Sequence, residues 1–590
     1  MPSPQQRIRT HLEFLYGEQT AASLWPQFNA LLTEYRTSLP EFQQASASPQ
    51  ERLTERDVFL ITYADQFTSA KDSSLACLQE FLDKDLAKAL SGVHILPFYP
   101  YSSDDGFSVI DYFQVDPRHG SWEDIVSMGK HYRLMFDAVI NHISKESDWF
   151  QGYLAGEDIH EDYFIEANSK DDLSQVVRPR ALPLLTSFET ARGPRQVWTT
   201  FGPDQIDLNY ANPQLLLEIV QLLLFYVAKG AEVIRLDAIA YLWKELGTSS
   251  IHLPQTHSVI KLFRSVLDEL APHVILITET NVPHEDNISY FGAALDGSDH
   301  FDEAQMVYQF PLAPIVLHTF IQEDASVLSS WAASLGTPSP STTFFNFIAS
   351  HDGIGLMPAK GLLADEEIHA IVERTLAHGG HASNKSNADG TESVYELNIT
   401  LYDALNDPKQ PNAQIDIQRF LASQAIMLAL AGVPGIYAHS LFGSRNCHSC
   451  VEETDRPRSI NRKKFDIITL RQTLSDPMSV ASRISGRYLQ LIELRKAYAA
   501  FHPNASQHIL ELSPSVFAVL RRSVDKKQSI LAITNVSKQA VDLDVPVNVL
   551  GLGNGIAWKD LVLEQVVQVQ GGKIPIDLQP YQFIWLFTED

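Results

Sequence analysis

The chain has 590 residues, is 45% apolar and 20% charged, and carries a formal net charge of −27. This length and composition are typical of a globular enzyme with one large domain and one or two smaller ones. The acidic balance argues against a nucleic-acid partner, because phosphate backbones are bound by basic surfaces.

The N-terminal sequence contains no apolar stretch of signal-peptide length, and no run of about 18 apolar residues occurs elsewhere. The cysteines, Cys77, Cys447 and Cys450, are too few for a disulfide framework and odd in number. We therefore expect a cytoplasmic protein without a membrane partner. The "CHSC" spacing at 447–450 lacks a second ligand pair for structural zinc, so we interpret these cysteines as free thiols in a loop.

Residues 1–50 are predicted to form an N-terminal helical extension that ends in the polar stretch "QQASASPQER". After it, short apolar runs that turn polar at their carboxyl ends alternate with helix-length stretches. These runs are "DVFLITYADQF", "SGVHILPFYPY", "HYRLMFDAVINH", "AEVIRLDAIAY", "APHVILITETN" and "TTFFNFIASHDG". The stretch before the fourth run has Asn212 as a possible N-cap, Pro213 at the first helical position and Gly230 after its end, which predicts a helix.

Alternating strands and helices predict a parallel sheet. Polar residues at the carboxyl ends of the strands favour a (β/α)8 TIM barrel built from residues 51–143 and 211–502. A doubly wound sheet is the alternative, but no GxGxxG turn opens any unit. Residues 144–210 are irregular and contain prolines, which indicates an inserted subdomain, and short strands after 503 predict a small all-β domain at 503–590.

Three acids, Asp237, Glu279 and Asp352, end three different apolar runs. Each could merely cap the helix that follows, but a barrel would bring all three to one pocket. Converging carboxylates suit cleavage of a glycosidic bond. One acid is protonated and assists the leaving oxygen, a second is ionised and attacks the anomeric carbon, and a third binds sugar hydroxyls.

Arg235 lies two residues before Asp237 in the same apolar run, and its charge favours the ionised form of the acid. His142 and His351 also stand at strand ends. A metal site is the rival interpretation. However, the two histidines belong to different strands, and no HExxH motif occurs.

The motifs "DAVINH", "VIRLDAIAY", "ITETN" and "ASHD" resemble characteristic blocks of the α-amylase superfamily, glycoside hydrolase family 13. Within it, "LITYADQF", "VRPRALPL", "DQIDLNY" and "SINR" are similar to the sucrose phosphorylase subfamily, and the resemblance runs from about residue 56 to the C-terminus. It implies a barrel with an inserted domain B and a C-terminal antiparallel β domain. It also implies retaining transfer of glucose to phosphate through a β-glucosyl-enzyme.

By this resemblance Asp237 is the nucleophile, Glu279 the acid/base and Asp352 the transition-state stabiliser. The positions similar to those that hold the glucosyl unit are Asp104, Phe107, His142, Arg235, His351 and Arg458. The remaining matches are Phe201 and Gln205 on the acceptor side, Tyr241 near the nucleophile, Arg180 at the phosphate, and Tyr395 near both phosphate and acceptor.

On the acceptor side the chain departs from sucrose-specific members. It has Asn281 where they usually have His, Ser393 where they have Asp, and Arg445 in "GSRN" where they have a "GEND"-like stretch. "TETNVPHEDNISYFG" and "LFGSRN" are more similar to the glucosylglycerate phosphorylases of the same subfamily. Glycerate carries a carboxylate that fructose lacks, so Arg445 is expected to bind it, with an ordinary ion pair as the alternative. Lys385 is a second candidate.

The resemblance therefore implies reversible phosphorolysis of 2-O-α-D-glucosyl-D-glycerate to α-D-glucose 1-phosphate and D-glycerate. The alternatives are a phosphorylase of sucrose or glucosylglycerol, an α-glucoside hydrolase, and a non-catalytic sugar-binding protein. No metal or organic cofactor is implied, and phosphate is a co-substrate. The expected partners are a small α-glucoside and phosphate, and a homodimer is compatible with the sequence.

Overall fold

A computed structural model of the chain describes residues 2–39, 52–86, 89–168, 170–386, 391–551 and 557–589. In these ranges eight parallel strands close a barrel, each beside its neighbours in chain order. They are β1 (Phe59–Thr62), β3 (Gly92–Ile95), β4 (Arg133–Ala138), β9 (Ala231–Leu236), β10 (Ile275–Thr278), β11 (Met306–Tyr308), β12 (Thr343–Asn346) and β16 (Val433–Tyr437). The predicted TIM barrel is confirmed.

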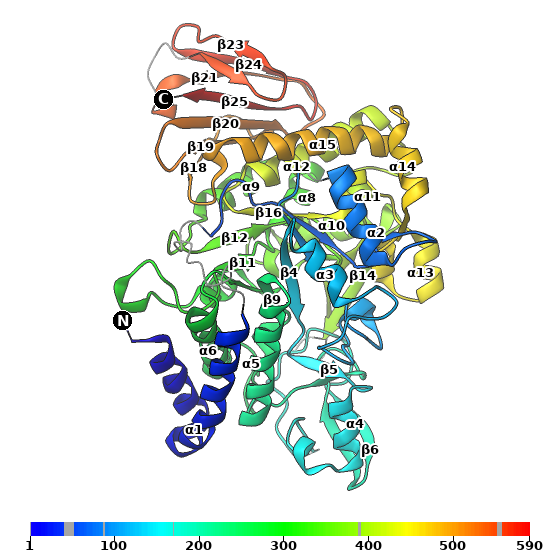
Figure 1. Cartoon of the computed structure of the whole chain (residues 1–590). Helices are drawn as coiled ribbons and strands as arrows, with labels where there is room; N and C mark the ends of the chain where they lie inside the picture. Colours follow the sequence, from blue (N-terminus) through cyan, green and yellow to red (C-terminus); the bar gives the residue numbers. More distant parts are fainter. Residues whose placement is uncertain are drawn as a thin grey trace.

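Helices cover the outside of the barrel (Figure 1). They include α2 (Ser74–Phe81), α3 (Trp122–Met128), α5 (Pro213–Ala228), α6 (Pro254–Leu270), α8 (Leu312–Gln322), α9 (Ser326–Ser334), α12 (Ala413–Ala429), α14 (Ile467–Ser475) and α15 (Val480–Ala497). Helix α5 begins as its sequence predicts, because the Asn212 side chain accepts hydrogen bonds from the backbone N–H groups of Gln214 and Leu215.

An insertion follows β4 and ends before α5. It contains β5 (His142–Ser144), α4 (Asp148–Ala155), β6 (Leu185–Thr190), β7 (Gly193–Trp198) and β8 (Gln205–Asp207). Strands β5 and β8 pair antiparallel, with His142 opposite Asp207 and Ser144 opposite Gln205. This pairing brings the two ends of the insertion side by side, next to the carboxyl end of β4.

A second insertion lies between β12 and β16. It contains β13 (Ile354–Gly355), α10 (Asp365–Ala377), β14 (His381–Ser386), β15 (Glu392–Asn398) and α11 (Leu401–Leu405). The strands form a sheet in the order β13–β15–β14, with a bulge in the β14–β15 pairing at Ser383 and Asn384. After β16 come α13 (His448–Thr454) and the 3-10 helix η11 (Pro457–Asn461).

Antiparallel strands form the C-terminal region, at the opposite end of the molecule from β5 and β6 (Figure 1). One sheet has the order β18 (Ser506–Ile509), β19 (Val516–Arg522), β20 (Gln528–Asn535), β25 (Phe583–Glu589), β22 (Trp558–Asp560) and β23 (Gln565–Val567). Strands β21 (Val541–Pro546) and β24 (Lys573–Leu578) pair separately. Apolar residues of both sheets share a core distinct from that of the barrel.

The long N-terminal helix α1 (Pro4–Ser38) packs against α6 and α5 on the outside of the barrel (Figure 1). Gly17, with a φ of 79°, interrupts its helical conformation and divides it into two arms. Residues of both arms reach Glu269 of α6: the Gln5 side chain donates a hydrogen bond at 2.9 Å, and Arg36 forms an ion pair.

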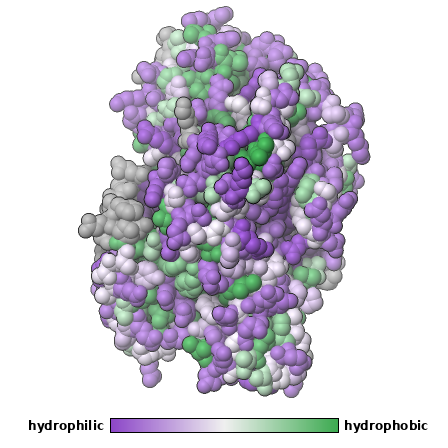
Figure 2. Space-filling model, turned by 45° about the vertical axis from the view of Figure 1, so that its right-hand side comes forward, coloured by the Kyte–Doolittle hydropathy of each residue, from purple (hydrophilic) through white to green (hydrophobic). Residues whose placement is uncertain are grey.

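The face shown in Figure 2 is predominantly hydrophilic, with apolar side chains scattered over it. This agrees with the acidic composition. Of the helices in the described ranges, none combines the length and apolar character that crossing a bilayer requires.

Candidate active site

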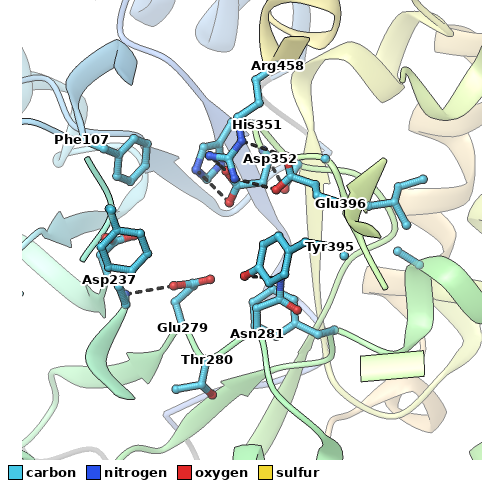
Figure 3. Close-up of a pocket in the computed structure, with 18 of the residues that line it drawn as sticks. Phe107, Asp237, Glu279, Thr280, Asn281, His351, Asp352, Tyr395, Glu396 and Arg458 are labelled. Carbon is cyan, nitrogen blue, oxygen red and sulfur yellow. Dashed lines mark hydrogen bonds and ion pairs between the residues drawn. The ribbon is translucent and has the colours of Figure 1, made fainter. Parts of the chain in front are cut away.

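The three acids at the strand ends line one cavity. Asp237 follows β9, Glu279 follows β10, and Asp352 lies six residues after β12. The cavity is also lined by these sequence-predicted residues: Asp104, Phe107, His142, Arg180, Phe201, Gln205, Tyr241, His351, Tyr395 and Arg458. The barrel therefore brings together residues that are far apart in the sequence (Figure 3).

The buried Arg235 of β9 connects two carboxylates. Its Nη1 lies 2.7 Å from Asp237 Oδ1 and also pairs with Asp137 at the end of β4. Its Nε donates a hydrogen bond to the Tyr308 hydroxyl at 3.1 Å. Burial raises the pKa of the Asp237 carboxyl, and the Arg235 charge acts in the opposite direction. The two charges within the apolar run are thus an ion pair at the cavity wall.

Glu279 lies one strand away from Asp237 in the barrel and has weaker cationic support. Its Oε2 accepts a hydrogen bond from the Ala238 N–H at 2.9 Å and lies 4.0 Å from Arg235 Nη2. Ala238 has a φ of 48°, a left-handed conformation that is uncommon for a residue with a Cβ. Burial, with the charges of Asp237 and Asp352, raises the pKa of Glu279 to about 7. Glu279 is therefore partly protonated at neutral pH.

Asp352 has the opposite environment. Burial disfavours its charge, but Arg458, whose Nη1 lies 2.6 Å from Oδ1, holds the pKa of Asp352 well below its usual range. Arg458 also donates two hydrogen bonds, at 2.9 and 2.6 Å, to the carboxylate of Glu396 on β15. Figure 3 shows Arg458 between the two acids. Asp352 is therefore ionised at neutral pH and can accept hydrogen bonds from sugar hydroxyls.

Aromatic rings form the wall beside these acids. Phe107 stacks on His351 with ring centroids 4.9 Å apart, and burial lowers the pKa of His351 to about 3, so that its ring is neutral. The carbonyl oxygen of Phe107 accepts a hydrogen bond from Gln205 Nε2 at 3.0 Å and lies 2.8 Å from His142 Nε2. Asp104 lies at the start of the same loop, 3.5 Å from Arg462 Nη1. A flat apolar ring beside polar groups suits a sugar ring.

The other side of the cavity is formed by the two insertions and by the loop after β10. The Arg180 guanidinium lies 5.8 Å from the Tyr395 ring centroid. Asn281 Nδ2 donates a hydrogen bond to the Tyr395 hydroxyl at 3.1 Å (Figure 3). Phe201 and Tyr241 meet edge to face, with ring centroids 5.5 Å apart. This side therefore combines aromatic rings with one guanidinium.

The expectation for Arg445 requires correction. Its guanidinium pairs with Asp403 on α11, its side chain is 49% exposed, and it is not among the residues that line the cavity. The ordinary ion pair, considered as the alternative, is what the structure contains. Lys385 lies on β14 opposite Ser393 and does not line the cavity either.

The interpretation of Cys447 and Cys450 as free thiols is also wrong. The two cysteines form a disulfide at the start of α13, whereas Cys77 is buried and unpaired. Within the described ranges, no group of three or more His, Cys, Asp or Glu side chains is arranged to hold a metal ion.

The cavity residues that were not predicted as site residues from the sequence include Asn281 and Glu396. Asn281 had been noted only as a departure from related sequences, and Glu396 follows Tyr395 in "SVYELN". Glu396 is 2% exposed. The available signal was a charge within a short run of strand-forming residues, the same signal that identified Arg235 and Asp237.

The geometry allows the two halves of a double displacement. An ion-paired carboxylate, Asp237, faces the same cavity as Glu279, a carboxyl group that titrates near neutrality. A nucleophile must be ionised and an acid must hold its proton at the same pH, and the two environments favour this division. The pair can therefore break and form a glycosidic bond.

Comparison with known proteins agrees with this chemistry. Residues 82–336 match the alpha-amylase catalytic domain. The chain is 48% identical to the glucosylglycerate phosphorylase of Spirochaeta thermophila, covering 90% of this chain and 89% of that protein. It is 43% identical to the glucosylglycerate phosphorylase of Escherichia coli, covering 99% and 100%.

Among solved structures, the fold is similar to that of sucrose 6F-phosphate phosphorylase from Thermoanaerobacter thermosaccharolyticum. The TM-score is 0.71 at 23% identity, with 88% of this chain and 97% of that chain covered. The likeness to the solved structure concerns the fold, whereas the two relatives are similar in sequence over nearly their whole lengths. The chain therefore belongs to the α-amylase family, glycoside hydrolase family 13, in the branch that contains the glucosylglycerate phosphorylases.

Proposed function

We propose that the protein is a retaining phosphorylase of 2-O-α-D-glucosyl-D-glycerate. The reaction is reversible and gives α-D-glucose 1-phosphate and D-glycerate. The observation that carries the proposal is the pair of acids in one cavity, Asp237 ion-paired to Arg235 and Glu279 with a pKa of about 7. The near full-length similarity to glucosylglycerate phosphorylases supports the identity of the substrate.

In the first step, the Asp237 carboxylate attacks the anomeric carbon while Glu279 donates its proton to the glyceryl oxygen. The bond from the anomeric carbon to that oxygen breaks, glycerate leaves, and a β-glucosyl ester forms on Asp237. In the second step, a phosphate oxygen attacks the anomeric carbon from the opposite face. The ester bond breaks, and a proton of the phosphate passes to Glu279.

Asp352 is proposed to bind sugar hydroxyls as positive charge develops at the anomeric centre. Its low pKa keeps it ionised, and its ion pair with Arg458 fixes its position. Phe107, stacked on His351, is proposed to lie against the glucosyl ring. No cofactor enters either step, and phosphate is a co-substrate.

The test is the release of glucose 1-phosphate from glucosylglycerate with and without phosphate. We expect the product only with phosphate, and undiminished rates after treatment with a metal chelator. Asp237→Asn should lower the rate by about 10⁴-fold or more while the protein stays folded, because an amide does not form the glycosyl ester. Release of free glucose at equal rates without phosphate would instead identify a hydrolase.

A panel of acceptors identifies the leaving group. With glucose 1-phosphate as donor, D-glycerate should be glucosylated in preference to fructose and glycerol. Preference for fructose would identify a sucrose phosphorylase, and preference for glycerol a glucosylglycerol phosphorylase.

A further inference from the structure

The CxxC motif at 447–450 has no part in the proposed reaction. Its two cysteines, three residues apart, form a disulfide between the N-cap of α13 and the first turn of that helix. CxxC spacing is typical of cysteine pairs that exchange disulfides with other thiols. A disulfide that closes so short a loop restricts the unfolded chain less than one that spans a long loop, so it contributes less to the stability of the fold. Its location points to a role near the cavity.

The disulfide lies at the junction of two elements that form part of the cavity wall. On one side, the Asn446 side chain accepts a hydrogen bond at 2.9 Å from the N–H of Thr400, two residues after β15. On the other side, the Cys447 N–H donates a hydrogen bond at 2.9 Å to the carbonyl oxygen of Ile460 on η11. The turn that the disulfide closes therefore joins the end of β15 to η11.

These two elements carry the side chains that support Asp352. Glu396 lies on β15 and Arg458 on η11, and Arg458 lies 2.6 Å from both Glu396 and Asp352 (Figure 3). At the end of α13, the Thr454 hydroxyl donates a hydrogen bond at 2.7 Å to the hydroxyl of Ser459, the residue after Arg458. Because α13 contacts η11 at both of its ends, a movement of its first turn can displace the guanidinium that holds Asp352.

The two cysteines differ in exposure. Cys447 is buried, whereas Cys450 is half-buried and follows the exposed His448 and Ser449. An incoming thiolate is therefore expected to attack Cys450 and to displace Cys447. The Ser449 hydroxyl lies 3.7 Å from Cys447 Sγ and can donate a hydrogen bond to the displaced thiolate.

We propose that Cys447 and Cys450 form a reversible thiol–disulfide exchange site whose reactant is a dithiol, and that reduction of the site lowers the activity of the enzyme. A thiolate of the dithiol attacks Cys450 Sγ, the bond between the two cysteine sulfurs breaks, and its electron pair passes to Cys447 Sγ. The second thiolate of the dithiol then attacks the sulfur that is bonded to Cys450, and Cys450 leaves. Two electrons and two protons pass to the cysteine pair, and the dithiol becomes a disulfide.

Reduction opens the turn, so that the Cys447 N–H is no longer held against the Ile460 carbonyl. Arg458 then loses part of the support that fixes its position beside Asp352. We expect kcat/KM to fall about fivefold, the factor that corresponds to the loss of one hydrogen bond. The exchange itself does not depend on the proposed function, whereas its effect on activity rests on the role proposed there for Asp352.

The test equilibrates the enzyme with mixtures of reduced and oxidised dithiothreitol. Free thiols are identified by alkylation and mass spectrometry, and activity is measured as fluoride release from α-D-glucosyl fluoride and as phosphorolysis of glucosylglycerate. We expect the thiols of Cys447 and Cys450 to appear together while the protein stays folded, and kcat/KM for both substrates to fall in step with them. Cys450→Ser should show the lower kcat/KM in every mixture, because it does not form the disulfide.

Cys77→Ala is the matched control, because Cys77 is buried on α2 and unpaired. This variant should respond to the mixtures as the wild type does. Arg458→Lys tests the route from the disulfide to the cavity. Its kcat/KM should change by less than about twofold on reduction, because an ammonium group lacks the planar fork that contacts two carboxylates together.

Retention of the disulfide in the folded enzyme under excess reduced dithiothreitol would overturn the exchange site. Two thiols that oxidised dithiothreitol does not join would also overturn it. Reduction with an unchanged kcat/KM would overturn the effect on activity, and a full response in Arg458→Lys would overturn the route through Arg458. Fluoride release by the wild type without any phosphorolysis of glucosylglycerate would instead contradict the proposed function.

Discussion

Glu279 and Asp237 face the same cavity but differ in the cation within their reach. Arg235 Nη1 lies 2.7 Å from Asp237, whereas Nη2 lies 4.0 Å from Glu279. Burial acts on both acids, so the difference in ion pairing decides which one keeps its proton. The division of roles in the proposed reaction follows from one guanidinium placed unequally between two carboxylates.

This difference predicts the pH dependence of glucosylglycerate cleavage. The first step needs protonated Glu279, whose pKa is about 7. Above that pH, kcat/KM should therefore fall about tenfold per pH unit. The wild type should lose this limb when the donor is α-D-glucosyl fluoride, because fluoride leaves without a proton donor. A limb that persisted with this donor would assign the titration to another group.

The same pKa makes a prediction about stability. Burial raises the pKa of Glu279 to about 7, so the neutral carboxyl stabilises the folded state at low pH. The contribution is complete below the pKa of an unfolded Glu, about 4.3, and is lost as the pH rises through about 7, by at most about 4 kcal/mol. Glu279→Gln should therefore unfold at a higher temperature than wild type at about pH 8 but not at about pH 5.

At the residue scale, the sequence correctly predicted the cavity residues that follow the ends of barrel strands. Asp237, Glu279 and Asp352 end apolar runs, and a barrel brings such ends together whatever the details of packing. Arg445 was misplaced because its position depends on the path of a long loop. There, Asp403 satisfies its charge, and the sequence contains no signal for a pairing across 42 positions.

At the scale of elements, the sheet β13–β15–β14 forms part of the cavity wall, and close packing joins it to the loop after β10. A Cβ added at Gly355 on β13 would lie 2.8 Å from Asn281 Nδ2. Gly355 therefore leaves the space in which the Asn281 amide reaches the Tyr395 hydroxyl. The absence of a side chain at Gly355 therefore allows β13 and the loop after β10 to pack closely enough for this hydrogen bond to form.

We expect Gly355→Ala to displace the Asn281 amide and break its hydrogen bond to Tyr395. One lost hydrogen bond of about 1 kcal/mol corresponds to about a fivefold lower kcat/KM for glycerate. The check is a double-mutant cycle with Asn281→Ala, which removes the amide. Gly355→Ala should have little further effect in that background. Additive losses would show that Gly355 acts independently of Asn281.

The sequence indicated the barrel strands and helix α5 more clearly than this sheet. Helix α5 carries an N-cap, a proline at its first position and a long apolar run, and these are local signals. The β14–β15 pairing contains a bulge, and β13 has two residues. Such short and irregular pairings depend on tertiary contacts, and periodicity over a few residues does not reveal them.

At the scale of the whole molecule, α1 packs against α6 on the outside of the barrel and does not form part of the cavity wall. Besides the contacts of its two arms with Glu269, Arg7 lies 2.7 Å from Asp268, which also pairs with Arg264 and His300. Burial opposes the charge of Asp268, but its contacts with Arg264, His300 and Arg7 hold the pKa of Asp268 well below its usual range. The sequence predicted helices here but not the surface that they cover, because complementary surfaces are not encoded locally.

The position of α1 predicts a loss of stability without a loss of catalysis. Leu12 is fully buried on α1, whereas Phe14, two residues away, is 57% exposed. Leu12→Ala should destabilise the packing of α1 by about 2–5 kcal/mol, because it removes buried methyl groups and leaves a cavity. Phe14→Ala should change the stability of the packing of α1 by no more than about 0.5 kcal/mol.

Hydrogen exchange measures this effect region by region, which suits a large chain whose parts need not unfold together. Faster exchange is expected in α1 and α6 of Leu12→Ala, and not in the C-terminal strands. Asp237 and Glu279 follow the barrel strands β9 and β10 and line the cavity, whereas α1 packs against α6 and α5 on the outside of the barrel. Therefore kcat/KM at room temperature should stay within about twofold of wild type. Equal increases of hydrogen exchange in Leu12→Ala and Phe14→Ala would contradict the packing of α1. A large loss of kcat/KM in Leu12→Ala would show that α6 transmits changes in α1 to Glu279.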